Sequence, residues 1–254
     1  MLNTLQTLEH EAMNQPLVWK FLDALFPPFC CSCGEMGYEL CPDCIRKISL
    51  IDQKNICPVC SDQSEEAKIC IKCSKSRPYF DQLRSWGEYS GVLRNVIQKY
   101  KFDRGLGLTR FICGPSVEFI ESWGIKVDHI IPVPLSNSRL HDRGYNQSAL
   151  LAASISRALK IEIKPQALTR VKETRSQVGL TSKERQDNVF CAFTADKFAN
   201  RNKSVLVIDD IATTGSTLNE CARALINSGA KKVYGYTVAK TPLPKTQLEG
   251  MEDK

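Results

Sequence analysis

The feature that most constrains the fold is the stretch over residues 205–218, which reads Val-Leu-Val-Ile-Asp-Asp-Ile-Ala-Thr-Thr-Gly-Ser-Thr-Leu. Its first four residues are apolar and three of them are β-branched, which predicts a short strand buried on both faces, as in a parallel sheet. Apolar residues then recur at helical spacing, at Leu218, Ala222, Leu225 and Ile226. A doubly buried strand that passes through one tight turn into a helix predicts an α/β fold.

The turn combines two kinds of side chain. Asp209 and Asp210 follow the apolar run, and hydroxyls then crowd around a glycine in Thr213, Thr214, Gly215, Ser216 and Thr217. Unpaired N–H groups at a helix N-terminus attract phosphate, and carboxylates suit ribose hydroxyls or a hydrated Mg²⁺. The pattern therefore predicts a cradle for ribose 5-phosphate. The alternative is a capped helix with nothing bound, and the glycine patterns of dinucleotide and nucleoside-triphosphate loops are absent.

This stretch resembles the phosphoribosyl-pyrophosphate (PRPP) loop of type I phosphoribosyltransferases. That loop has four apolar residues, two acidic residues and a small-residue turn with Thr or Ser before Gly, and every position is filled here. The resemblance implies the type I phosphoribosyltransferase fold, a parallel sheet flanked by helices, with PRPP and Mg²⁺ as ligands. It also implies that Asp209 and Asp210 lie against the ribose and that residues 213–217 hold its phosphate.

Eight of the twelve cysteines form four Cys-x-x-Cys pairs, namely Cys30/Cys33, Cys41/Cys44, Cys57/Cys60 and Cys70/Cys73. Two such pairs complete a tetrahedral Cys₄ zinc site. A disulfide scaffold is typical of short secreted proteins, whereas this chain has 254 residues and no recognisable signal peptide. We expect two structural zinc ions in sequential sites, with an interleaved cross-brace as the alternative and Cys31 as an alternative ligand to Cys30.

Positive charge is concentrated outside the segment that contains the paired cysteines. The net charge is +6, residues 84–110 hold six basic and two acidic side chains, and residues 139–190 hold ten basic and five acidic ones. Residues 30–78 hold seven of each sign. A pyrophosphate ligand or single-stranded nucleic acid would explain the basic segments, and a solvated face is the alternative. The cysteine segment is at least as well suited to stabilising the protein or docking a partner as to gripping DNA.

A second resemblance begins after a predicted strand at residues 128–134. A cationic loop there ends in Arg-Gly-Tyr-Asn-Gln at residues 143–147, close to the Arg-Gly-Phe/Tyr-Asn-Gln signature of the ComF family of competence-associated proteins. The resemblance also includes the paired cysteines, Lys101-Phe102 and a polar segment at 169–188. This segment lies where phosphoribosyltransferases carry a mobile hood that closes over the substrate. The resemblance covers roughly residues 22–241. In the type I fold this loop holds pyrophosphate, which implies a ligand-binding set of Lys101, Arg139, Arg143, Gly144 and Gln147.

These patterns divide the chain into four parts. We expect a helical extension at 1–29, a double zinc ribbon at 30–78, a phosphoribosyltransferase-like domain at 79–241 and a loose tail at 242–254. No apolar run approaches the ~18 residues of a membrane span, so we expect no membrane insertion and a cytoplasmic location. We also expect that disrupting the cysteine segment leaves the phosphoribosyl site intact.

The ComF resemblance implies a protein that handles incoming single-stranded DNA during natural transformation, alongside a helicase partner. Binding of PRPP or a DNA 5′-phosphate without turnover fits the basic segments. One alternative is an active Mg²⁺-dependent phosphoribosyltransferase of nucleobase or related metabolism. Its catalysis would be electrostatic, through Asp209, Asp210 and Arg143. The acceptor is undetermined, since no side chain stands out as a general base. A further alternative is a PRPP-sensing regulator.

Overall fold

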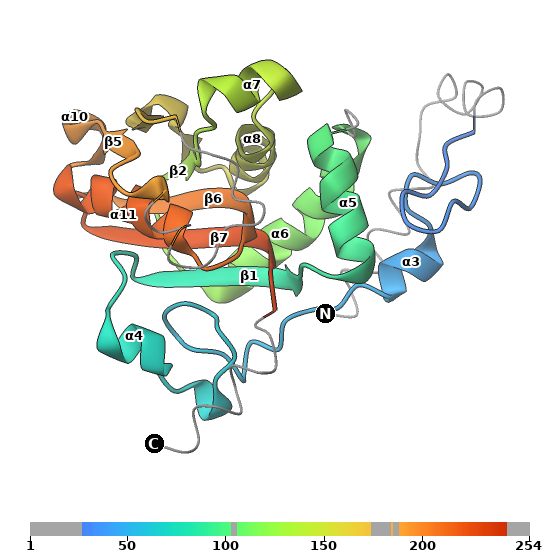
Figure 1. Ribbon diagram of the computed structural model, residues 1–254, viewed down its shortest axis with the longest axis horizontal. Coiled ribbons are helices and arrows are strands. Elements are labelled where there is room, and N and C mark those ends of the chain that lie inside the picture. The colour runs from blue at the N-terminus through green and yellow to red at the C-terminus, as the bar shows by residue number, and fades with distance from the viewer. Residues whose placement is uncertain (1–26, 103–105, 174–183, 185–187, 243–254) are drawn as a thin grey trace.

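The computed structural model describes residues 27–102, 106–173, 184 and 188–242. A five-stranded parallel sheet lies at its centre, in the order β1-β7-β6-β2-β3 (Figure 1). Its strands are β1 (Gln82–Glu88), β2 (His129–Pro132), β3 (Glu162–Ile163), β6 (Ser204–Ala212) and β7 (Lys232–Lys240). The type I phosphoribosyltransferase architecture that the sequence predicts is therefore present.

Strand β6 is buried on both faces, as its apolar run predicts. Leu206 and Ile208 pack on one face with α5 (Gly91–Phe102), α6 (Thr109–Trp123) and α8 (Gln147–Leu159). Val205 and Val207 pack on the other face with α11 (Ser216–Asn227). The crossovers after β2 and β6 thus run over opposite faces, which leaves a crevice at the carboxyl ends of these two neighbouring strands.

The remaining elements are short. They are α3 (Pro42–Arg46), η1 (Glu65–Ala67), α4 (Ile71–Lys75), η2 (Leu106–Leu108), α7 (Asn137–Arg143), η3 (Pro165–Ala167), β4 (Leu168–Arg170), β5 (Phe193–Ala195) and α10 (Lys197–Asn200). Strands β4 and β5 form an antiparallel pair at the two ends of the predicted hood. Most of the hood, at 174–183 and 185–187, lies outside the described residues, as do Arg104, residues 1–26 and residues 243–254.

Two local expectations need correction. Strand β6 does not end before the acidic pair but extends to Ala212, because β7 continues alongside it. The cationic loop after β2 contains a helix, α7, which is capped by the Ser136 hydroxyl and closed by Gly144 at φ 77°. Helix α6 runs through Pro115. Proline removes one N–H donor there, and the next residue adds a side-chain bond, since the Ser116 hydroxyl donates to the Ile112 carbonyl one turn back.

The cysteine module, residues 30–78, covers the otherwise open edge of β1. The Leu83 N–H donates to the Val59 carbonyl at 2.7 Å, and the Ile51 N–H donates to the Trp86 carbonyl at 3.1 Å. Lys240, at the end of β7, is buried and forms a 2.6 Å ion pair with Asp62 of the module. An edge strand protected in this way cannot pair with another chain. In the described residues, no helix is both long and apolar enough to cross a membrane.

Candidate functional site

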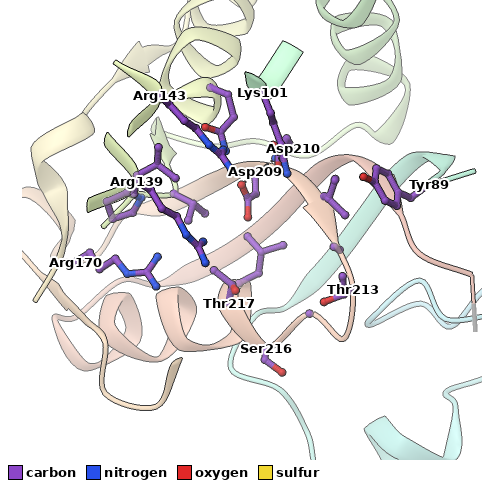
Figure 2. Close-up of a pocket in the computed structure, with 18 of the residues that line it drawn as sticks. Tyr89, Lys101, Arg139, Arg143, Arg170, Asp209, Asp210, Thr213, Ser216 and Thr217 are labelled. Carbon is purple, nitrogen blue, oxygen red and sulfur yellow. Dashed lines mark hydrogen bonds and ion pairs between the residues drawn. The ribbon is translucent and has the colours of Figure 1, made fainter. Parts of the chain in front are cut away.

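A cavity of about 700 Å³ opens at the carboxyl ends of β2 and β6 (Figure 2). The acidic pair lies in its middle, between Arg143 and Lys101 above and residues 213–217 below (Figure 2). The predicted site residues that line it are Lys101, Arg139, Arg143, Gln147, Asp209, Asp210, Thr213, Gly215, Ser216 and Thr217. The structure thus gathers ten of the twelve predicted residues around one space. Thr214 and Gly144 lie outside its lining.

The phosphate loop, residues 213–217, enters the 12-residue helix α11 through Gly215. Gly215 has a φ of 76°, a conformation that favours glycine. The Thr214 hydroxyl lies 2.7 Å from the Ser216 hydroxyl and accepts from the Ser216 N–H at 3.3 Å. The first turn of α11 contains no acidic residue, so its N–H groups and dipole offer an uncompensated positive end to an anion.

The two carboxylates differ in their surroundings. Asp209 accepts hydrogen bonds from the Ser148 hydroxyl at 2.8 Å and from the Asp210 N–H at 2.9 Å. Burial, together with the nearby charge of Asp210, raises the pKa of Asp209 to about 7. Asp210 is buried and forms a 2.9 Å ion pair with Lys101. The pair can therefore accept hydrogen bonds from two neighbouring ligand hydroxyls, and near neutral pH it holds a proton part of the time.

The Arg-Gly-Tyr-Asn-Gln motif joins α5 to α8 beside the acidic pair. The Tyr145 hydroxyl donates to the Tyr100 carbonyl, and the Tyr100 hydroxyl donates to the Gln147 carbonyl at 2.9 Å. The Asn146 side chain caps α8 by accepting from its second and third N–H groups. These bonds fix the end of α5, which carries Lys101, against the helix that carries Ser148. The motif therefore sets the position of both partners of the acidic pair.

Three arginines give the cavity its positive side. Arg139 and Arg143 come from α7, and Arg170 reaches in from β4 (Figure 2). Burial lowers the pKa of Arg143 from its ordinary high value, and the charge of Asp210 opposes that effect. The guanidinium of Arg170 lies 5.4 Å from the centre of the Phe193 ring on the paired strand β5. Three cations facing a helix N-terminus suit a ligand with more than one phosphate.

Gln147 carries a polar atom with no partner. Its side chain is 3% exposed, and its Oε1 has no hydrogen-bond partner among the described residues. Since Gln147 lines the cavity, a ligand hydroxyl or an ordered water is the donor that this acceptor would take.

Sequence reasoning missed some of the site. Ser148, Arg170 and Tyr89 all reach the acidic pair or the cavity lining but were not among the predicted site residues. Tyr89 had a usable signal, because it follows β1 at the same edge of the sheet. Ser148 had none, because only the fold brings α8 against β6.

The eight paired cysteines form two sequential groups, as their spacing predicts. One group is Cys30, Cys33, Cys41 and Cys44, and the other is Cys57, Cys60, Cys70 and Cys73, with the ligand atoms of each within 4.8 Å of one another. The Cys33–Cys41 and Cys60–Cys70 sulfur distances are both 3.6 Å. A tetrahedral zinc ion with 2.3 Å bonds requires about 3.8 Å. Both groups, the first and second tetrads, therefore fit a structural zinc ion.

Comparison with known proteins agrees with this arrangement. The double zinc ribbon domain family matches residues 21–74, and the phosphoribosyl transferase domain family matches residues 146–248. Competence protein F of Haemophilus influenzae is 32% identical over 210 residues, which cover 79% of this chain and 90% of that protein. The DNA utilization protein YhgH of Escherichia coli K12 is 29% identical (80% and 91% covered), and competence protein ComFC of Bacillus subtilis is 26% identical (90% and 91% covered).

Proposed function

Because the chain belongs to the ComF family of competence proteins, we propose that it binds PRPP with Mg²⁺, or a close phosphoribosyl relative, and handles single-stranded DNA during uptake. The names of its relatives, competence protein F and DNA utilization protein, support the role in DNA uptake. The phosphate loop beside the acidic pair supports the ligand. That juxtaposition is the observation that carries the proposal.

Each part of the cavity has a proposed partner on the ligand. The N–H groups of the phosphate loop take the 5-phosphate, and Asp209 and Asp210 accept from the ribose hydroxyls. Arg139 and Arg143 take the pyrophosphate, with Lys101 moving between Asp210 and the ligand. Mg²⁺ would neutralise pyrophosphate charge, and its bound waters suit the same carboxylates. Gln147 would satisfy its Oε1 with a ligand hydroxyl or water.

The first experiment is calorimetric titration of the zinc-loaded protein with PRPP, ribose 5-phosphate and pyrophosphate, each with and without Mg²⁺. We expect PRPP to bind more tightly than either fragment, since it engages the phosphate loop and the arginines at once, and Mg²⁺ to strengthen its binding. The absence of any binding at millimolar PRPP would overturn the phosphoribosyl assignment. Competition between PRPP and a 5′-phosphorylated oligonucleotide would show whether DNA enters the same cavity.

An active transferase is the second candidate, because the cavity places Asp209 beside the phosphate loop and the arginines. An Asp209 pKa of about 7 suits a group that accepts a proton near neutral pH, which attack by a nucleobase nitrogen requires. Pyrophosphate release measured across a panel of nucleobases distinguishes the two functions. Release that depends on an acceptor supports transfer, whereas PRPP binding without release supports the binding protein.

A further inference from the structure

The helix that carries a ligand of the second tetrad contacts the phosphate loop through one lysine. Lys72 lies on α4 between the ligands Cys70 and Cys73, and its ammonium donates to the Thr214 carbonyl at 2.9 Å. A second contact lies one residue beyond the module, where the Tyr79 N–H donates to the Asn219 side chain at 2.7 Å in the first turn of α11, the helix that follows the loop. The module and the residue that follows it thus hold both the loop and the start of its helix.

The Lys72 bond determines which way one peptide group faces. In a trans peptide the C=O and the following N–H point in opposite directions. With the Thr214 carbonyl held on the side of the module, the Gly215 N–H of the same peptide faces away from it. Gly215 lines the cavity, whereas Lys72 and Thr214 do not. Glycine adopts positive and negative φ about equally, so Gly215 permits either orientation of this peptide, and the lysine bond favours the observed one, in which φ is 76°.

The position of Lys72 depends in turn on the metal site. Helix α4 has five residues, too few to be stable alone in water. Cys70 precedes it and Cys73 lies within it, so a metal ion bound to both would hold the helix in place. The other pair of ligands, Cys57 and Cys60, is also fixed to the sheet, since the carbonyl of Val59 between them accepts from the Leu83 N–H. The Leu83 side chain lies directly beneath Gly215.

The first tetrad has different neighbours. The Ser32 hydroxyl accepts from the Asn95 amide of α5 at 3.2 Å, and Glu39 pairs with Arg110 of α6 at 3.0 Å. Its buried cysteines pack in the core on the α5 and α6 face of the sheet. The residues beside its ligands thus bond α5 and α6, whereas Lys72, beside the ligands of the second tetrad, bonds the phosphate loop.

We propose that Lys72 is a positioning residue, through which the second zinc site holds the phosphate loop in its anion-binding form. Zinc binding at the second tetrad and phosphoribosyl binding in the cavity then reinforce each other, because a coupling between two binding sites is reciprocal. This inference builds on the proposed function, since it assigns the loop to a phosphate.

The test compares Lys72→Met with Lys75→Met in the full zinc-loaded protein. Both lysines are exposed on α4, and both changes keep the side-chain stem while removing one ammonium. Zinc content is measured first, and we expect two ions per chain in both variants. Hydrogen exchange of the amides at residues 214–217, measured without ligand, should speed up in Lys72→Met and match the wild type in Lys75→Met. Equal exchange in all three proteins would overturn the positioning role.

Two further measurements address the coupling. PRPP–Mg²⁺ affinity should fall about three- to tenfold in Lys72→Met, the range expected for loss of one hydrogen bond, and stay unchanged in Lys75→Met. A chelator should remove the two zinc ions in two phases, and PRPP should slow one phase in the wild type but not in Lys72→Met. Ligand protection that survives in Lys72→Met would refute the coupling through this residue. If the wild type binds no PRPP, the proposed function fails, and the exchange measurement still decides whether Lys72 positions the loop.

Discussion

At the scale of single residues, the acidic pair lowers the stability of the folded protein but supplies charged acceptors for a ligand. Asp209 and Asp210 are adjacent and the second is buried, so their charges repel one another in the folded protein. Ser148 and Lys101 each offset part of this cost through a hydrogen bond or an ion pair. If the two carboxylates had only a structural role, their negative charge would not stabilise the protein. If they accept hydrogen bonds from ligand hydroxyls, that charge strengthens the binding.

The double change Asp209→Asn and Asp210→Asn distinguishes a structural role of the pair from a ligand-binding role. It keeps the side-chain shapes but removes both charge-assisted acceptors, each worth ~1.5–3 kcal/mol. We expect the rise in melting temperature that PRPP–Mg²⁺ gives the wild type to disappear, with little loss of stability in the absence of ligand. Glu162→Gln is the control, because Glu162 is an exposed carboxylate on β3 whose partner is Lys164. A double variant that melts much earlier yet still responds to PRPP would contradict a ligand role for the pair.

The pKa of Asp209 predicts how both properties depend on pH. Its folded value, about 7, is above the unfolded value of about 3.9, so the folded state favours the protonated form. Its contribution to stability is therefore fully present below pH ~4 and is lost as pH rises through 7. Ligand affinity should move oppositely and increase from pH 6 to 8, since the carboxylate is the acceptor. Melting curves and titrations across this range, for wild type and Asp209→Asn, test both directions. Equal pH slopes in the two proteins would refute the assignment.

The residue types of the site were predictable where they lie close together in the chain. The acidic pair and the phosphate loop occupy one short stretch, and their chemistry is visible in it. The contacts that tune them were not predictable, because Lys101, Ser148 and Arg170 come from three other elements. Lys101 was predicted to bind the ligand, and the structure adds its ion pair with Asp210.

At the scale of elements, local sequence was informative wherever an apolar pattern had one clear period. The apolar run of β6 and the turn before α11 follow their patterns, although β6 continues past this run to Ala212. The helix α7 was missed because its seven residues are mostly polar and lack such a pattern. The covering of the β1 edge by the cysteine module was not predicted either, because nothing in the sequence of the strand indicates it.

The two tetrads lead to a prediction about the module. Metal analysis of protein purified without chelator should find two zinc ions per chain, and Cys33→Ser or Cys57→Ser should each lower this number to one. Metal binding supplies much of the folding free energy of such small units, so each variant should also lose stability. Finding one zinc ion or none in the wild type would contradict the assignment of both tetrads.

The two cysteine variants should differ in their effect on the cavity. The sequence alone suggested that disrupting the module would spare the phosphoribosyl site, but the contact from Lys72 to Thr214 changes that expectation. Cys57→Ser should weaken PRPP binding, whereas Cys33→Ser should affect it less, because the first tetrad contacts α5 and α6.

At the scale of the whole molecule, the cysteine module and the sheet share their cores. Cysteines of the first tetrad are buried with α5 and α6, and those of the second are buried with Leu83 and α11. The buried ion pair between Lys240 and Asp62 joins the same two parts. Paired cysteines predicted a zinc ribbon but not this shared packing, because side-chain contacts between distant segments leave no periodic signal in the sequence.

The distribution of charge over the molecule leads to the last prediction, on DNA. The basic segments converge on the side of the cavity, where Lys101, Arg139, Arg143 and Arg170 meet. If single strands bind there through their phosphates, affinity should fall by ~0.7 log unit per log unit of salt for each phosphate neutralised. Lys99→Glu, on α5 two residues before Lys101, should weaken binding and reduce the salt slope by about one if the strand also follows this end of α5.

The matched control for that variant is Lys232→Glu. Lys232 is an exposed lysine at the amino end of β7, so it lies at the opposite edge of the sheet from the cavity while giving the same change in net charge. Fluorescence anisotropy of a labelled oligonucleotide at several salt concentrations measures affinity and slope together. An equal loss in both variants would mean that net charge alone attracts DNA. A loss confined to Lys99→Glu would mean that the strand contacts this end of α5, because only a local contact distinguishes two lysines of equal charge.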